Sequence, residues 1–136
     1  NYRELWRQLG EQGEIVQATA YAIERNDAGQ RGFQQVLRDI GFEVKLKPFI
    51  QRSDGSAKGD WDVGIAIDIM DCAATTNPPE EIVLLSGDGD FDLLLARVSQ
   101  RYAVSTSVFG VAALTAASLI DAADHFQPIQ TRLLLK

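Results

Sequence analysis

Three aspartates stand close together where one apolar run of the sequence ends and another begins. Residues 82–98 read IVLLSGDGDFDLLLARV, in which Asp88, Asp90 and Asp92 alternate with glycine and phenylalanine. One such aspartate can cap the following helix or complement its dipole, and needs no further explanation. Three are more than a cap requires, because like charges held close raise each other's proton affinity unless a cation neutralises them. Carboxylate oxygens suit magnesium or manganese, so the segment predicts a divalent-metal site.

A calcium-binding EF-hand loop that starts at Asp88 is excluded by two of its positions. The sixth position is Leu93, where such a loop needs glycine, and the twelfth is Ser99, where it needs a bidentate glutamate. A sugar-nucleotide transferase can also carry an Asp-x-Asp pair at a strand end. A chain of 136 residues leaves little length for its separate acceptor site, so that interpretation is weak.

A second acidic segment lies upstream, where residues 58–70 read KGDWDVGIAIDIM. Asp60 fits the N-cap of a helix and Asp62 its first turn, where the positive end of the helix dipole favours a carboxylate. Asp68 interrupts an otherwise apolar run, so it faces either polar groups in a crevice or a narrow solvent-facing strip. The apolar residues at helical spacing share one face: Val63, Ile67 and Met70.

The order of elements places the aspartates in an α/β fold. Hydrophobic periodicity predicts helices over residues 2–13, 31–41, 60–74, 90–102 and 113–124, and strands over residues 14–23, 42–49, 80–87, 104–110 and 125–129. Alternating strands and helices predict a three-layer α/β domain with a largely parallel sheet. Ligands bind such sheets at the carboxyl ends of the strands, which is where Asp88 follows its strand.

Composition limits the domain organisation and the compartment. The 136 residues fit one domain, spanning residues 1–136. The single cysteine, Cys72, excludes an internal disulfide and a multi-cysteine zinc site. No apolar run reaches the roughly 18 to 20 residues that cross a bilayer, and the first residues lack a signal-peptide core. We therefore expect a cytoplasmic protein with no membrane partner.

The net charge of −6 argues against non-specific nucleic-acid binding by the whole surface. The local charge is different between residues 45 and 58, where one aspartate opposes four basic residues: Lys45, Lys47, Arg52 and Lys58. This segment is either a solvated loop or a rim that contacts phosphates.

The acidic segments together resemble a known family. The order KGDWDVGIAID, LLSGDGDF and SLIDAADHF is similar to the NYN domain, in its LabA-like branch, a member of the PIN-like nuclease superfamily. The resemblance covers essentially the whole chain in the right order, and these positions match its motifs: Lys58, Gly59, Asp62, Asp68, Ser86, Gly87, Asp88, Asp90, Phe91, Ser118, Leu119, Ala123, Asp124 and Phe126. The resemblance implies a three-layer, Rossmann-like α/β/α fold of the PIN-like type.

The resemblance also implies a metal-dependent ribonuclease that cleaves RNA phosphodiester bonds with a metal-activated water. Asp62, Asp88 and Asp90 would hold one or two Mg²⁺ or Mn²⁺ ions. Three further residues would support these ligands without binding the metal directly: Ser86, Asp68 and Lys58. The basic residues expected to guide the RNA backbone are Lys45, Lys47 and Arg52.

Two features depart from the family pattern. The spacing from Lys58 to Asp62 is one residue longer than usual, and the six-residue interval to Asp68 favours Asp62 over Asp60 as the ligand. The family also begins with a strand that ends in an aspartate, and no such strand precedes Tyr2. That strand would be central in the sheet and would carry a principal ligand, so we expect the numbered chain to be a trimmed version of a longer protein.

Two other functions remain open from the sequence. The domain could be a regulatory or RNA-binding module that keeps the acidic pocket without cutting, acting as a homodimer or through a protein partner. It could also be a phosphatase or nucleotidase that acts on small phosphate esters with the same metal-bound water. Metal binding without turnover distinguishes the first, and activity on nucleotides without activity on RNA distinguishes the second.

Overall fold

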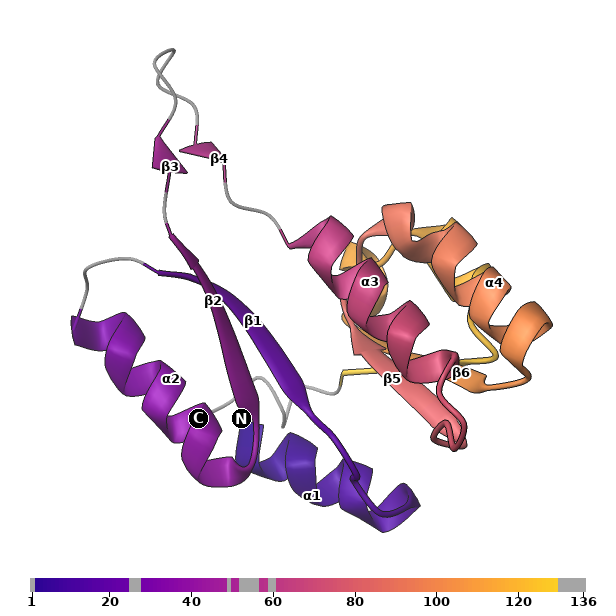
Figure 1. Cartoon of the computed structure of the whole chain (residues 1–136), viewed down its shortest axis with the longest axis horizontal. Coiled ribbons are helices and arrows are strands. Elements are labelled where there is room, and N and C mark those ends of the chain that lie inside the picture. Colours follow the sequence, from indigo (N-terminus) through magenta and orange to yellow (C-terminus); the bar gives the residue numbers. More distant parts are fainter. Residues whose placement is uncertain (1, 25–27, 49, 52–56, 59–60, 130–136) are drawn as a thin grey trace. The chain divides into compact units, whose positions relative to one another are not determined.

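The structure is a computed structural model that describes residues 2–24, 28–48, 50–51, 57–58 and 61–129. Helices alternate with strands along the chain, and the larger strands pair in parallel, as predicted for the α/β class (Figure 1). The chain divides into two compact units, Asn1–Trp61 and Asp62–Lys136. Each unit has its own strand pairing and its own packing, and each is described by itself.

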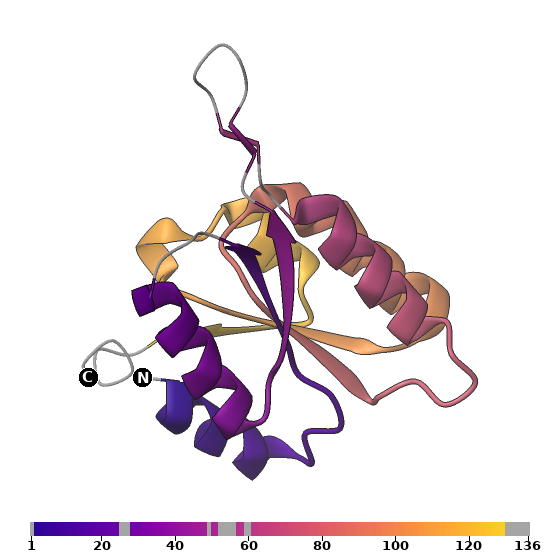
Figure 2. The same ribbon diagram turned by 60° about the vertical axis from the view of Figure 1, so that its left-hand side comes forward.

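The first unit contains a parallel strand pair connected through a helix (Figure 2). Its elements are α1 (Tyr2–Gln12), β1 (Thr19–Glu24), α2 (Ala28–Ile40), β2 (Glu43–Pro48), β3 (Ile50–Gln51) and β4 (Ala57–Lys58). The register of β1 and β2 runs from Thr19 opposite Glu43 to Glu24 opposite Pro48. Strands β3 and β4 form a short antiparallel pair where the sequence predicted only a polar loop, because backbone pairing there does not depend on an apolar pattern.

Strand β1 begins at Thr19, five residues later than the predicted strand. The first bond of its ladder runs from the Glu43 N–H to the Ala18 carbonyl at 2.9 Å, so residues 14–18 lie before the partner strand begins. Alternating β-branched residues predicted a strand there, and the prediction of its start was wrong because strand ends are set by pairing.

Helix α2 begins at Ala28, three residues earlier than predicted, and ends at Ile40. The next residue, Gly41, has φ 137°, a conformation that favours glycine. A Cβ at Gly41 would lie 2.7 Å from the Trp6 indole, so close packing as well as backbone conformation requires glycine at this helix end.

The second unit contains a three-stranded parallel sheet in the order β5-β6-β7. Its elements are α3 (Asp62–Ala73), β5 (Glu81–Leu85), η1 (Gly89–Phe91), α4 (Asp92–Tyr102), β6 (Ser105–Gly110), η2 (Ala112–Leu114), α5 (Ala117–Ala122) and β7 (His125–Pro128). Strand β7 lies at an edge of this sheet, as Pro128 predicted. Within the described residues β5 pairs with β6 alone, and the strand expected before Tyr2 stays a prediction.

The predicted helix over residues 113–124 is divided into η2 and the short helix α5. Thr115 lies between them, and its hydroxyl donates a hydrogen bond to the Val111 carbonyl at 2.8 Å. This bond closes a turn that competes with helix formation, which is why the helix begins only at Ala117.

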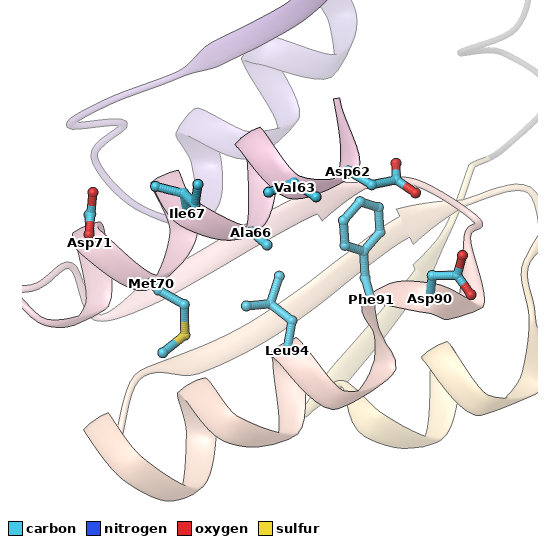
Figure 3. Close-up of a pocket in the computed structure, with 9 residues that line it drawn as sticks. All are labelled: Asp62, Val63, Ala66, Ile67, Met70, Asp71, Asp90, Phe91 and Leu94. Carbon is cyan, nitrogen blue, oxygen red and sulfur yellow. The ribbon is translucent and has the colours of Figure 1, made fainter. Parts of the chain in front are cut away.

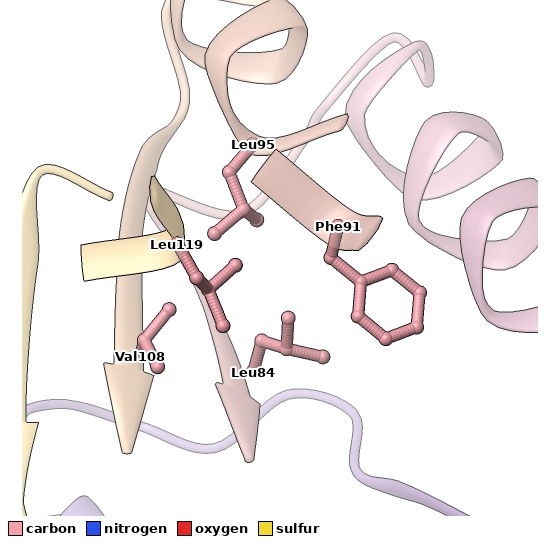
Figure 4. Close-up of a cluster of buried hydrophobic side chains, with 5 residues drawn as sticks. All are labelled: Leu84, Phe91, Leu95, Val108 and Leu119. Carbon is pink, nitrogen blue, oxygen red and sulfur yellow. The ribbon is translucent and has the colours of Figure 1, made fainter. Parts of the chain in front are cut away.

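The core of the second unit joins its sheet to α4 and α5 (Figure 4). Its buried side chains come from five elements and meet in one cluster: Leu84, Phe91, Leu95, Val108 and Leu119. Phe91 is 4% exposed, and burying a side chain of this size contributes about 1.5–3 kcal/mol. Because Phe91 belongs to the DGDFD segment, this burial fixes the acidic loop to the core.

Asp124 connects α4 to β6 at the turn before β7. Its carboxylate accepts hydrogen bonds from the Thr106 N–H and the Ser99 hydroxyl, each at 2.9 Å. These bonds lower the pKa of Asp124, chiefly through the Thr106 N–H, because they favour the charged form. The residue is a structural acceptor in the fold.

None of the helices in the described part of the chain is both long enough and apolar enough to cross a membrane.

Candidate metal centre

Three carboxylates from two distant segments come together in the second unit. Asp62, Asp88 and Asp90 each offer one oxygen, and these oxygens all lie within 4.8 Å of one another. Asp62 is half-buried in the first turn of α3, while Asp88 and Asp90 are exposed after β5. The structure thus brings together the three residues that the sequence nominated as metal ligands.

Hydrogen bonds of Ser86 and Asp88 shape the loop that carries the Asp88 and Asp90 carboxylates. The Ser86 hydroxyl accepts a hydrogen bond from the Asp88 N–H at 3.1 Å. Asp88 Oδ1 in turn accepts from the Asp90 N–H at 2.9 Å and caps η1. Ser86 therefore contacts the loop backbone, as a supporting residue would, and the capping interpretation of Asp88 is confirmed alongside its place in the cluster.

Gly87 allows the loop to pass close to the segment after η2. A Cβ at Gly87 would lie 2.4 Å from the Leu114 carbonyl oxygen, which is closer than a Cβ normally comes to an atom that it is not bonded to. The Gly87 carbonyl also accepts a hydrogen bond from the Ala116 N–H at 3.0 Å. The loop position is therefore fixed on both sides, by Phe91 in the core and by this backbone contact.

Asp92 does not join the three-carboxylate cluster within the described structure. It lies in the first turn of α4, and its Oδ1 accepts a hydrogen bond from the Leu93 N–H at 2.6 Å. Asp92 therefore has the role that the sequence allowed for one of the three aspartates, complementing the dipole of α4. Asp60, the other candidate near α3, lies outside the described residues.

The donor set of the cluster fits a hard divalent cation. Three carboxylates supply only oxygen ligands, which Mg²⁺ and Mn²⁺ prefer. Metal–oxygen distances of about 2.0–2.1 Å put opposite ligands roughly 4.2 Å apart, slightly less than the 4.8 Å limit of the cluster. The Asp90 carboxylate is exposed and can rotate to meet this separation while Asp88 stays in place. A cation would also offset the repulsion between the carboxylates.

An apolar groove adjoins the cluster (Figure 3). It has a volume of about 470 Å³ and lies between α3 and the segment of η1 and α4. Asp62 and Asp90 stand at one end of it and Asp71 at the other (Figure 3). Apolar side chains fill the stretch between the ends: Val63, Ala66, Ile67, Met70, Phe91 and Leu94.

Sequence reasoning missed this groove. The sequence feature that could have indicated the groove is the apolar helix face formed by Val63, Ile67 and Met70. In the structure Val63 is 71% exposed and Ile67 is 54% exposed, so this face is not covered by the core. Helical periodicity alone does not separate an exposed apolar face from a buried one.

The remaining predicted residues do not join the cluster in the described structure. Asp68 lies in α3 six residues after Asp62, about 9 Å farther along the helix axis. Lys58 lies in β4, and its side chain is outside the described part. Arg52 is also outside the described residues.

Lys45 and Lys47 belong to β2 in the first unit, two residues apart and so on one face of the strand. The Lys47 ammonium lies 4.7 Å from the centre of the Trp61 ring. Trp61 Nε1 donates a hydrogen bond to the Ala22 carbonyl at 2.8 Å, and the Tyr21 ring lies 5.3 Å away. Trp61 is therefore an anchor for the chain before α3, rather than an open platform for a nucleobase.

A family model described as the NYN domain matches residues 1–130. The chain belongs to the NYN domain family. This result confirms the predicted family and extends over both units of the chain. The acidic cluster of this NYN domain fits a PIN-like nuclease family, whose members typically use divalent metals.

Two relatives support this assignment. The NYN domain is 33% identical over 121 residues to the low amplitude and bright protein LabA of Synechococcus elongatus, a match that covers 83% of the chain. The chain spans 62% of the length of this curated relative. It is also 50% identical to a protein of unknown function from Vibrio parahaemolyticus, whose crystal structure it matches with a TM-score of 0.87. That match covers 96% of the chain and 79% of the other, and it confirms the predicted α/β fold class.

Proposed function

We propose that this NYN domain is a metal-dependent ribonuclease that cleaves RNA phosphodiester bonds. The observation that carries the proposal is the convergence of Asp62, Asp88 and Asp90, from segments separated by α3 and β5, on one point. Exposed acidic residues are common on their own. Membership of a family that fits PIN-like nucleases gives this cluster its functional meaning.

Asp62, Asp88 and Asp90 would bind the Mg²⁺ or Mn²⁺ ion. When bound, such an ion lowers the pKa of a coordinated water and stabilises charge on the phosphate. The chain prepares the ligands beforehand. Asp88 Oδ1 is engaged by the Asp90 N–H, which fixes the Asp88 side chain and leaves Oδ2 for the cation.

The surrounding residues would hold this arrangement in place during turnover. Ser86 fixes the backbone of Asp88, and Phe91 fixes the loop to the core. Asp62 lies at the positive end of α3, where its negative charge is favoured before a metal binds. Preorganised ligands need little rearrangement as the reaction proceeds.

RNA would be attracted by basic residues outside the cluster. Lys45 and Lys47 share one face of β2, and contact with phosphates would offset the overall charge of −6. Asp68 and Lys58 would support the metal ligands, and Arg52 would help to guide the RNA backbone. The protein would act in the cytoplasm, where RNA is available.

Cleavage of labelled single-stranded RNA by the full-length protein tests the proposal. With Mn²⁺ or Mg²⁺ present, wild type should cleave, and Asp88→Asn and Asp90→Asn should each lose activity by about 100-fold or more, because the amide keeps the shape and removes the charge. Asp92→Asn is the matched control, since its carboxylate comes from the same segment and lies outside the cluster. It should retain activity within a few-fold.

The outcomes separate the three candidate functions. Cleavage that survives both Asp88→Asn and Asp90→Asn contradicts the proposal and indicates a contaminating nuclease. Metal binding without cleavage of RNA supports the regulatory module. Turnover of nucleotides or p-nitrophenyl phosphate without turnover of RNA supports the small-substrate phosphatase.

A further inference from the structure

We propose that residues 130–136 of this chain bind in the apolar groove between α3 and α4 and cover its end at Asp62 and Asp90. The segment reads QTRLLLK and lies outside the described residues. The match to the NYN family model ends at residue 130, so the segment lies almost entirely beyond it. The inference concerns binding, and it goes beyond the proposed function because it holds whether or not the domain cleaves RNA.

The groove has an apolar wall that the described part of the chain leaves exposed. Val63 is 71% exposed and Ile67 is 54% exposed, and both line the groove from α3. Covering such side chains is favourable by roughly 25 cal/mol per Å² of apolar surface removed from water. A groove of about 470 Å³ with this lining favours an occupant with several aliphatic side chains in succession. The three consecutive leucines at 133–135 have this character.

The charges of the groove and of the segment are complementary in kind and in order. Asp62 and Asp90 lie at one end of the groove, Asp71 lies at the other, and no lining residue is basic (Figure 3). The segment has a basic residue on each side of its leucines, Arg132 and Lys136, and no acidic residue. Opposite charges in matching positions fix the register of an apolar contact.

The spacing of the charges also agrees. Asp62 and Asp71 are nine residues apart in α3, which is about 13.5 Å along the helix axis. Arg132 and Lys136 are four residues apart, which is about 13 Å in an extended chain. An extended segment can therefore place one cation at each acidic end of the groove while its leucines contact the apolar stretch between them.

The segment starts close enough to the groove to reach it within one chain. The Ile129 N–H donates a hydrogen bond to the Gly110 carbonyl at 2.9 Å, which holds Ile129 at the carboxyl edge of the sheet. Asp88 follows β5 at the same edge, and β6 alone lies between β5 and β7. Two strand spacings are about 10 Å, and three extended residues span about 10 Å. Arg132 is therefore expected at the Asp88 end of the groove and Lys136 at the far end.

A segment bound in this way restrains the metal centre. Arg132 would compete with a cation for Asp62 and Asp90, and the leucines would cover the approach to these carboxylates. If the domain is a ribonuclease, release of the segment should speed cleavage.

Met70 provides the signal for a direct test, because it lines the groove and is the single methionine of residues 1–136. In full-length protein with a ¹³C-labelled methionine methyl group, Met70→Leu assigns this signal. Cys72 is the single cysteine of the same residues, so Cys72→Ser with Lys136→Cys places one nitroxide label at the end of the segment. The label should broaden the Met70 methyl signal, since Lys136 is expected at that end of the groove.

A second labelled protein separates specific binding from mere proximity. Replacing the three leucines at 133–135 with serine keeps the length of the segment and removes its apolar contacts, so the broadening should be lost. Leu114→Ser is the matched control, because Leu114 is 76% exposed and does not line the groove. It should leave the broadening unchanged.

A charge exchange tests the expected direction of the segment. In unlabelled protein, Asp71→Lys should shift the Met70 methyl signal toward its position in the serine variant. Adding Lys136→Glu should move the signal back, because the pair is restored with its signs reversed. Failure of the second change to restore the signal overturns the pairing of Lys136 with Asp71.

The outcomes also separate this inference from the ribonuclease proposal. Absent broadening, or equal broadening in the serine variant, overturns the bound segment and leaves the ribonuclease intact. Broadening only in a mixture of nitroxide-labelled and ¹³C-labelled proteins means that the segment of a second copy fills the groove, which overturns binding within one chain. Specific broadening without cleavage of RNA supports the bound segment and contradicts the ribonuclease. Where RNA is cleaved, the serine variant should cleave it at least about threefold faster than wild type, and an equal rate overturns the restraint on the metal centre.

Discussion

Asp88 Oδ1 accepts a hydrogen bond from the Asp90 N–H at 2.9 Å, so one candidate ligand holds the backbone of the other. The two residues therefore form one structural unit, and its shape is set before a metal binds. Changes in the loop that keep both carboxylates should therefore still weaken metal binding.

Gly87→Ala should damage the site without removing a ligand. The added methyl group would lie 2.4 Å from the Leu114 carbonyl oxygen, which belongs to the backbone and cannot rotate away. We expect a loss of about 1–3 kcal/mol in the free energy of unfolding and weaker binding of Mn²⁺, measured by urea denaturation and by calorimetry. Gly32→Ala is the control, because nothing lies within 4 Å of its Cβ position in α2, and it should be neutral or stabilising. Unchanged metal affinity in Gly87→Ala would show that the loop does not need this close approach.

Ser86→Ala removes the hydroxyl that accepts from the Asp88 N–H. We expect the affinity for Mn²⁺ to fall about 10- to 100-fold, as is typical when a group that orients a ligand is removed. Ser86→Thr keeps a hydroxyl and should restore most of the affinity. Equal affinities for the alanine variant and wild type would mean that Ser86 plays no part in positioning Asp88.

Asp124→Asn should change how stability depends on pH. The pKa of Asp124 is lowered by hydrogen bonds from the Thr106 N–H and the Ser99 hydroxyl, so its folded value lies below its unfolded value of about 3.9. The stability that the charged form contributes is therefore present above about pH 4 and is lost as the pH falls through the folded value. Urea denaturation should show wild type to be the more stable at neutral pH, with the difference shrinking below about pH 4. Asp121→Asn, at an exposed position of α5, is the control. If the difference in stability between wild type and Asp124→Asn does not shrink in acid, the charged form of Asp124 is not the source of the stabilisation.

Lys45→Gln should reduce the electrostatic part of RNA binding. A lysine that contacts a phosphate contributes to the slope of log K against log salt, and its loss should lower the slope by about 0.7–1. Lys47→Gln should have a similar effect and should also cost about 0.5–1 kcal/mol of stability, because its ammonium lies over Trp61. Arg38→Gln, in the last turn of α2, provides a control for general charge loss. Slopes equal to that of the control would place the RNA away from β2.

The fold class and the identity of the clustered aspartates could be predicted from the sequence, because both depend on local signals. Hydrophobic periodicity marked the helices and strands, and the resemblance of the KGDWDVGIAID and LLSGDGDF segments to the NYN domain named the clustered aspartates. The ends of elements could not be predicted in the same way. The start of β1 is set by where Glu43 pairs, and the division of the last helix is set by the bond from Thr115 to Val111.

The presence of the groove required the structure, as did the turn that separates Asp90 from Asp92. Both aspartates occupy the same acidic segment, and only the turn of η1 directs Asp90 to the cluster while Asp92 begins α4. The apolar stripe that contains Val63 and Ile67 has the period of a core face, and its exposure depends on packing that the period does not encode.

Titration of the full-length protein with Mn²⁺ by isothermal calorimetry tests the central claim most directly, because it requires no substrate. Wild type and Asp92→Asn should bind Mn²⁺ with similar affinity, and Asp90→Asn should lose about 100-fold or more, since only the first substitution leaves the cluster intact. Wild-type affinity in Asp90→Asn, or an equal loss in both variants, would show that Asp62, Asp88 and Asp90 do not form the metal centre.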